Sequence, residues 1–451
     1  MRIPLGSIDI GSGGMFQPET DRARRTSSVR AANIEAFWSL LQSIVFGVLL
    51  IRASSDPVFN LLGGDSGAAS MGVGALFNVL VIAIAGIFFL RAPLKAPFPV
   101  LAIWGPFLLI AFGSTLYAPD FKAAVRLASV MLSYWAFFAI PFFILRSTLD
   151  VTRFVLAVIV SSIPPTLYAF LDIARGLSDL GEFRLQSTFS HPNIYAFYLV
   201  LVLGLALYVR ASRIVRVSPR IRTLVTLYIP LLMMFLLLTK TRSAWGVCGV
   251  MFLVYALKID RRFLAGLLLL PLLFIANPSL MDRLTDVTAA TEVDNFSQLN
   301  ESTRLNSYVW RQALWESAIP QVLDRPLLGH GLESFKLSTP SFFPLIGPQG
   351  IDGHNFYLQM SFELGFLGVL ALAWLLGCVA WRLVRGLRRD PPGLLIICCI
   401  LMAYMLESYS DNMHFYLSFN WYFWFVIGTI YAWVCREEAL DRADGRFRKV
   451  A

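Results

Sequence analysis

The sequence predicts an all-α, polytopic integral membrane protein with about twelve transmembrane helices and one large external loop. Of its 451 residues, 57% are hydrophobic and only 15% are charged, and the mean hydropathy is +0.65. A soluble core could not bury this much apolar surface, whereas a lipid bilayer accepts it. Apolar runs of about 20 residues, the length that crosses a bilayer, recur along the chain, and one long polar segment interrupts them.

The apolar runs predict a tail at 1–33, nine spans within 34–276, a loop at 277–353, three spans within 354–434 and a tail at 435–451. The predicted spans are 34–51, 71–90, 98–116, 122–145, 152–174, 192–209, 223–239, 243–257, 263–276, 360–381, 393–409 and 415–434. The long insert follows the ninth span. A major-facilitator transporter would place such an insert after the sixth, between two repeats of six.

The basic residues fall mostly in alternate short loops, which explains most of the net charge of +9. The loops rich in Arg and Lys contain Arg91, Lys95, Arg146, Arg153, Arg210, Arg213, Arg216, Arg220, Arg222, Lys258, Arg261, Arg262, Arg382, Arg385, Arg388 and Arg389. By the positive-inside rule these loops are cytoplasmic, so both termini are expected inside and the long loop outside. No basic helix or known motif indicates nucleic-acid binding.

No cofactor or metal site is expected from the residue spacings. The five cysteines lie in or at the inner end of spans and form no zinc pattern. Glu363, Glu407 and Asp411 lie near outer span ends on separate helices, where pairing with cations is a better interpretation than metal binding.

The long loop is expected to contain one amphipathic helix, from Ser302 to Leu323, with Ser302 as N-cap and Pro320 near its end. "DRPLLGHG" then predicts turns, and "PSFFPLIGPQG" predicts an extended stretch stiffened by proline.

Several cations break the orientation rule because they lie at predicted outer ends. These are Lys122, Arg126, Arg184, Lys240 and Arg242. An anionic substrate would explain them, since guanidinium groups hold phosphate oxygens in bidentate fashion. The alternative is that each reaches lipid headgroup phosphates.

The predicted loop helix presents Arg304, Tyr308, Arg311 and Trp315 at i, i+4, i+7 and i+11, and therefore on one face. Arginine mixed with aromatic rings suits a phosphorylated sugar. The alternative is a solvated helix whose aromatic residues dock on the membrane surface.

His354 is the main candidate for proton transfer. It is expected to begin the helix after the loop, where the electropositive N-terminus disfavours imidazolium and leaves a neutral base. Ser361, Gly365 and Gly368 would share its face on an ideal helix, and an N-capping role is the alternative. His330, His191 and His414 are weaker candidates.

Four segments of the chain resemble the O-antigen ligase and polymerase superfamily: "TKTRSAWG", "STRLNSYVWRQALW", "RPLLGHG" and "GHNFYLQMSFELGFLG". Their order and the large loop before the final spans are similar to that family over roughly residues 184–385. The His354–Asn355 pair followed by Glu-x-Gly-x-x-Gly is the most specific part.

The resemblance implies metal-independent, inverting transfer of a glycan from undecaprenyl diphosphate to a hydroxyl at the periplasmic face of a bacterial inner membrane. His354 is expected to be the base, and Arg242 and Arg304 are expected to stabilise the departing diphosphate. Supporting substrate contacts are expected from Lys122, Arg126, Arg184, Lys240, Tyr308, Arg311, Trp315 and Asn355.

The acceptor stays open at this point. A lipid A core sugar (ligase) is preferred slightly over a growing glycan chain (polymerase), and a protein hydroxyl ranks third. An exporter of lipid-linked sugar is the alternative from another class, but it would need charges in the middle of several spans. This chain concentrates its charges at their outer ends.

Overall fold

The computed structural model describes residues 36–58, 68–91, 98–176, 183–266, 275, 281, 307–343 and 345–444. Contacts divide the chain into two units, Met1–Gly47 and Val48–Ala451. The described part of the first unit is the start of a helix that spans Ala36–Arg52. Everything that follows concerns the second unit.

Every long element in the described part of the second unit is a helix, as the sequence predicted. In chain order these are α3 (Ala68–Arg91), α4 (Phe98–Ser114), α5 (Phe121–Ile144), α6 (Thr148–Ser161), α7 (Ile163–Gly176), α8 (Pro192–Ala211), α9 (Pro219–Leu238), α10 (Arg242–Lys258), α13 (Ser307–Asp324), α14 (Ser334–Phe342), α15 (Phe356–Gly386), α16 (Pro391–Ser410) and α17 (Leu417–Ala443). Within the residues that the structure describes, seven helical stretches are long and apolar enough to cross a membrane. A described helix covers most of each predicted span except 263–276, most of which lies outside the described residues, so the count of twelve stays a prediction.

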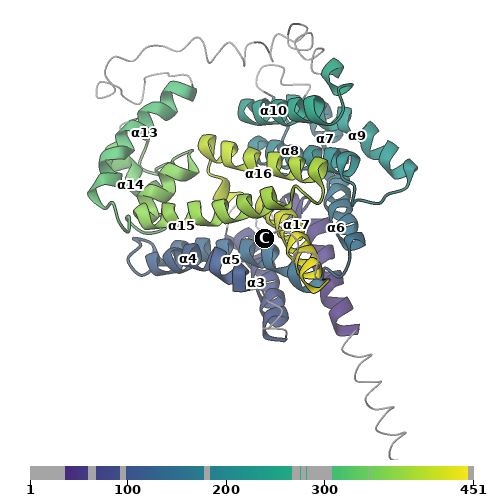
Figure 1. Cartoon of the computed structure of the whole chain (residues 1–451). Coiled ribbons are helices and arrows are strands. Elements are labelled where there is room, and N and C mark those ends of the chain that lie inside the picture. Colours follow the sequence, from purple (N-terminus) through teal and green to yellow (C-terminus); the bar gives the residue numbers. More distant parts are fainter. Residues whose placement is uncertain are drawn as a thin grey trace, which may run out of the picture. The chain divides into compact units, whose positions relative to one another are not determined.

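The helices pack side by side in layers. In Figure 1, α10, α16 and α15 lie in neighbouring rows, and α13 and α14 gather at one end of α15. The helix α17 packs most extensively on α5, where Trp421 and Phe425 lie against Phe137. These aromatic contacts bury α17 along most of its length.

One predicted span, 152–174, is broken in the structure. The helix α6 ends at Ser161, and Ser162 separates it from α7. Pro164 and Pro165 follow directly, and because proline has no N–H to continue the ladder, a new helix begins there.

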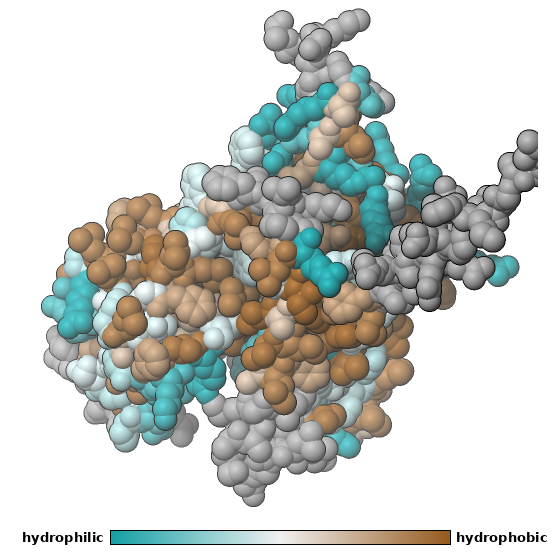
Figure 2. Space-filling view, turned by 90° about the horizontal axis from the view of Figure 1, so that it is seen from below, coloured by the Kyte–Doolittle hydropathy of each residue, from teal (hydrophilic) through white to brown (hydrophobic). Residues whose placement is uncertain are grey.

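Large apolar side chains cover much of the outer surface. Figure 2 shows brown side chains over a broad area, with teal hydrophilic side chains most numerous at the top of the view and smaller teal groups elsewhere. Leu76 of α3, Leu109 of α4 and Leu227 of α9 are each at least two-thirds exposed. Exposed leucines on this scale are typical of a surface that faces lipid, and the chain fits an integral membrane protein.

The described part of the loop folds back onto α15. The helix α13 agrees with the expected amphipathic helix, although Ser302 lies outside the described residues. Its buried Leu314 and Ala318 pack with Phe335 of α14 and Phe362 of α15 in one apolar cluster. The helix α14 was not predicted: its last three residues, Pro340–Phe342, are helical where the sequence suggested an extended stretch.

The turn "RPLLGHG" is bonded to a break inside α15. Gly365 has φ 65° and ψ −167°, so the helix is interrupted there. The exposed backbone groups bond to the turn: Phe366 N–H donates to Pro326 O at 2.7 Å, and Gly331 N–H donates to Glu363 O at 2.8 Å. A Cβ on Gly365 would lie 2.4 Å from the Leu327 carbonyl carbon. The ideal-helix alignment of Ser361, Gly365 and Gly368 beneath His354 was therefore wrong.

Candidate active site

The short connection between α9 and α10 places Arg242 at a helix start. Thr239 and Thr241 are buried, and Lys240 between them has φ 51°, a left-handed conformation that is uncommon for lysine. Thr241 is the N-cap of α10, so Arg242 is its first residue and lies half-buried. The turn therefore fixes the backbone from which Lys240 and Arg242 extend.

Arg184 holds this turn from a neighbouring segment. Its Nε donates to Thr239 O at 2.9 Å, and one terminal nitrogen donates to Thr241 Oγ1 at 3.1 Å and to Asn193 Oδ1 at 2.8 Å. Asn193 lies in the first turn of α8. Arg184 was expected to bind substrate, and the structure shows it in contact with protein groups that position Arg242.

The same Asn193 connects the turn to a buried carboxylate. Its Nδ2 donates to Asp411 Oδ2 at 2.6 Å, and Tyr416 donates its hydroxyl to Asp411 Oδ1 at 2.6 Å. Burial alone would raise the pKa of Asp411, but His354 and the hydrogen bonds from Tyr416 and Asn193 outweigh burial and lower it. Asp411 is therefore a buried anion.

His354 faces this anion. Its Nδ1 lies 3.9 Å from Asp411 Oδ1, within ion-pair distance and beyond hydrogen-bond distance. The imidazole is 32% exposed while the Asp411 side chain is only 4% exposed. The ring thus has one nitrogen toward a buried carboxylate and keeps access to the outside.

The backbone around His354 is held tightly. His354 itself has φ 46°, and α15 begins two residues later with Asn355 as N-cap, so the expectation that His354 starts the helix was wrong. Asn355 Oδ1 accepts from Tyr357 N–H and Leu358 N–H. The capping bonds already satisfy this amide oxygen, although Asn355 was expected to contact substrate.

Two more side chains fix the residue before His354. Gln359 Oε1 accepts from Gly353 N–H at 2.9 Å, and Trp315 Nε1 donates to Gly353 O at 2.8 Å. Trp310 meets the His354 ring edge-on at 5.9 Å between centroids. Trp315, expected to stack on sugar, thus supports the backbone of the histidine from α13.

The other predicted residues of the loop helix are spread along α13. Arg304 lies outside the described residues. Tyr308 is 55% exposed, and Arg311 is half-buried. The charge of Arg311 acts on Tyr416, whose pKa is raised by burial and by Asp411 and is lowered in part by this arginine. Arg311 therefore lies in the electrostatic range of the His354 site.

Lys122 and Arg126 belong to a second group of charges. They lie in the first turns of α5, behind the N-cap Asp120. Burial and Asp352 raise the pKa of Glu333 to about 6, and Arg126 opposes this. Burial raises the pKa of Asp352, while Lys336 and His354 lower it in part, so Asp352 interacts with both Glu333 and His354.

The remaining histidines have structural surroundings. Burial lowers the pKa of His414 to about 3, and its ring stacks on Phe356. His330 stacks on Phe362. His191 caps α8 by accepting from Asn193 N–H at 3.1 Å. Burial, Arg184 and His354 lower the pKa of His191, while Asp411 raises it, so His191 lies beside the same site.

Sequence reasoning missed most of the groups that organise the site. Asp411 was considered only as a partner for outer cations, and Asn193, Tyr416, Trp310 and Gln359 were not considered. The sequence could have indicated them by their polarity, because charged and amide side chains within apolar segments are energetically costly and usually have a functional role.

The fold and these contacts define a polytopic membrane protein in which a histidine, a buried carboxylate and an arginine-bearing turn meet at the ends of α8, α10 and α15. Residues 227–373 match the family model described as O-antigen ligase. The match confirms the resemblance to the O-antigen ligase superfamily, whose members are membrane glycosyltransferase-like ligases and polymerases. A comparison with curated proteins found no match.

Proposed function

We propose that this protein transfers a glycan from undecaprenyl diphosphate to an acceptor hydroxyl at the periplasmic face of the bacterial inner membrane. The transfer is metal-independent and inverts the anomeric centre. The family match supports the class of reaction, and the contacts around His354 support the assignment of roles.

In this proposal His354 is the general base. It takes the proton of the acceptor hydroxyl while the oxygen attacks the anomeric carbon, and the bond from that carbon to the diphosphate oxygen breaks. The imidazolium that forms faces the Asp411 carboxylate, which stabilises it and orients the ring. Asp411 is a positioning residue, because it acts through His354.

The leaving diphosphate gains negative charge as the glycosyl bond breaks, and cations must stabilise it. Arg242 and Arg304 carry this role in the proposal. Lys122, Arg126, Lys240 and Arg311 extend the cationic surface, with Tyr308 as a further substrate contact. Trp315 and Asn355 contribute by holding the backbone on either side of His354. Arg184 contributes by holding the Thr239–Thr241 turn.

One observation carries the proposal: a continuous path of contacts links the turn before Arg242 to His354. It runs from Thr241 through Arg184 and Asn193 to Asp411. A phosphate-binding arginine and a base attached to one hydrogen-bonded frame suit a reaction in which both must act on the same substrate.

The acceptor we favour is a lipid A core sugar, as in a ligase, with a growing glycan chain, as in a polymerase, second. An exporter of lipid-linked sugar is a further alternative. It is disfavoured because the charged path described above lies at helix ends and not along a passage through the spans.

The deciding experiment is transfer by the purified protein in detergent, with polyprenyl-diphosphate glycan offered separately to lipid A core and to a second glycan. Product with the first acceptor only supports a ligase, and product with the second only supports a polymerase. His354→Ala must abolish either product. No transfer to any hydroxyl acceptor, together with movement of the lipid-linked glycan across vesicles, would establish the exporter instead.

A further inference from the structure

A cavity of about 400 Å³ lies far from His354, at the opposite end of α8. His191 caps the beginning of α8, and Arg210 lies in its last turn. Because α8 has 20 residues, its ends are about 30 Å apart. The cavity is therefore separate from the candidate active site.

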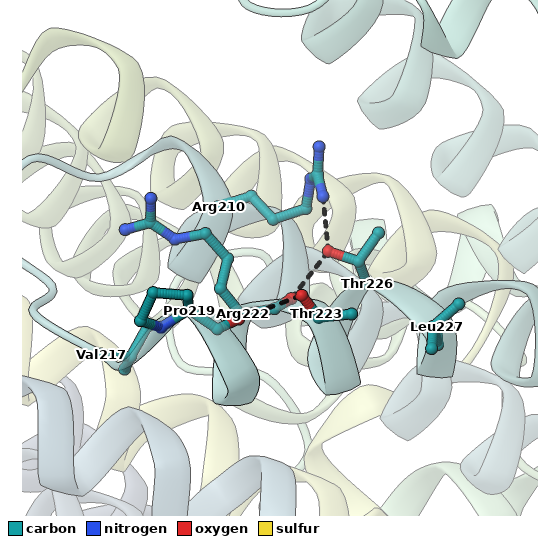
Figure 3. Close-up of a pocket in the computed structure, with 7 residues that line it drawn as sticks. All are labelled: Arg210, Val217, Pro219, Arg222, Thr223, Thr226 and Leu227. Carbon is teal, nitrogen blue, oxygen red and sulfur yellow. Dashed lines mark hydrogen bonds between the residues drawn. The ribbon is translucent and has the colours of Figure 1, made fainter.

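Two arginines and two hydroxyl groups line this cavity. The lining residues are Arg210, Val217, Pro219, Arg222, Thr223, Thr226 and Leu227. Figure 3 shows the guanidinium groups of Arg210 and Arg222 extending on the same side of the first turns of α9. No carboxylate is among the lining residues, and Asp260, which pairs with Arg210, lies outside the lining, so Arg222 gives the cavity its net positive charge.

Arg210 is fixed before any ligand arrives. It donates to Thr226 Oγ1 at 2.5 Å and to the Tyr255 hydroxyl at 3.2 Å, and it pairs with Asp260 at 3.4 Å. Its guanidinium also lies 5.1 Å from the centre of the Phe263 ring. A guanidinium held in this way binds phosphate without losing much conformational freedom.

Arg222 lies one helical turn before Thr226 and is exposed. Within the described part of the chain, its guanidinium has no ion-pair or hydrogen-bond partner. The apolar part of the lining continues into Leu224 and Leu227, which are 66% and 68% exposed on a helix apolar enough to cross a membrane. The surroundings thus combine fixed positive charge with a lipid-facing surface.

We propose that this cavity binds the phosphate of an anionic phospholipid headgroup in the cytoplasmic leaflet. Arg210 and Arg222 hold the phosphate oxygens, Thr223 and Thr226 border them, and the acyl chains run along Leu224 and Leu227. The site anchors the α8–α9 connection at the membrane surface. Free phosphate shares the headgroup's chemistry and is the other source that the test must separate.

The test uses the purified full chain in detergent and native mass spectrometry with short-chain phosphatidylglycerol. Arg222→Gln should weaken phosphatidylglycerol binding by at least about ten-fold, the loss expected when one hydrogen bond between charged groups is removed. Arg220→Gln is the matched control, because Arg220 is exposed on the same turn and does not line the cavity; it should change binding by less than about two-fold.

The outcomes are distinct and do not depend on glycan transfer. Equal losses in the two variants, or none in either, would overturn the site. Zwitterionic phosphatidylcholine bound as tightly as phosphatidylglycerol would also overturn it, because apolar contact alone would then explain binding. A last outcome is that inorganic phosphate raises the melting temperature, that Arg222→Gln removes this effect, and that phosphatidylglycerol does not bind. The cavity would then be a phosphate site for a free anion, and the lipid assignment would be overturned.

Discussion

Asp411→Asn is the substitution that most directly tests how His354 works. The asparagine keeps the size and part of the hydrogen bonding toward Asn193 and Tyr416, and it removes the charge that faces the imidazole. An ion pair at 3.9 Å is worth roughly 4 kcal/mol at an effective dielectric constant of about 20. Because the imidazole is 32% exposed, we halve this to about 2 kcal/mol, which is roughly a 30-fold loss of rate.

The assay is glycan transfer in detergent at one fixed pH. The double variant with His354→Ala should be no slower than His354→Ala alone, since Asp411 acts through the histidine. Glu407→Gln removes a buried carboxyl group one turn earlier on α16 and serves as the control. Additive losses in the double variant, or an equal loss in Glu407→Gln, would show that Asp411 does not act through His354 and has a merely structural role.

Three further predictions address the arginine, the helix break and the second charge group. Arg242→Lys should lose at least about ten-fold in transfer at unchanged expression, because lysine lacks the bidentate fork; near-normal turnover would contradict bidentate binding. Gly365→Ala should reduce the free energy of unfolding by about 2 kcal/mol or more and so lower the melting temperature in detergent. Gly377→Ala on the same helix, with nothing within 4 Å of its Cβ, should leave it unchanged. Glu333→Gln should raise the melting temperature at about pH 7.5 and not at about pH 4.5. The raised pKa of Glu333 means that the folded protein holds this proton more tightly, so the stabilisation is lost as pH rises through about 6. Equal shifts at both pH values would show that its charge does not matter.

The span pattern was predictable because lipid imposes one simple rule, an apolar run of sufficient length. That rule gave α5, α8, α9 and α16 to within a few residues, and the amphipathic face of α13 followed from its 3.6-residue period. It gave the span Thr148–Gly176 as well, but not its division into α6 and α7 at Ser162, because the two prolines lie in an apolar run whose composition stays uniform. It also failed at α14, whose nine residues have little helical preference and depend on Phe335 packing against Phe362.

The site was predictable in residue type and less so in arrangement. His354 and Arg242 stood out because their charge or chemistry was unusual for their place in the sequence. Asn193 and Asp411 are 218 positions apart, and no local pattern connects them. Their pairing depends on how α8 and α16 pack, which only the tertiary structure provides.

Two independent contacts support the backbone at His354, and one of them comes from α13. This explains why the described part of the loop packs closely on α15. A left-handed residue directly before a helix cap is strained, and it persists only where its neighbours are fixed. Gln359 holds Gly353 from within α15, and Trp315 holds it from α13. The helix α13 in turn packs on α15 through the apolar cluster around Phe362, and the turn between them is hydrogen-bonded to α15 at the Gly365 break.

Loosening α13 should therefore reduce transfer by misplacing His354, even for substitutions that never approach the substrate. Ala318→Asp, which buries an unpaired charge in that cluster, should lower activity together with hydrogen-exchange protection of residues 353–355. Unchanged protection there would show that the conformation of His354 does not depend on α13. Lost protection with full activity would show that transfer does not depend on that conformation.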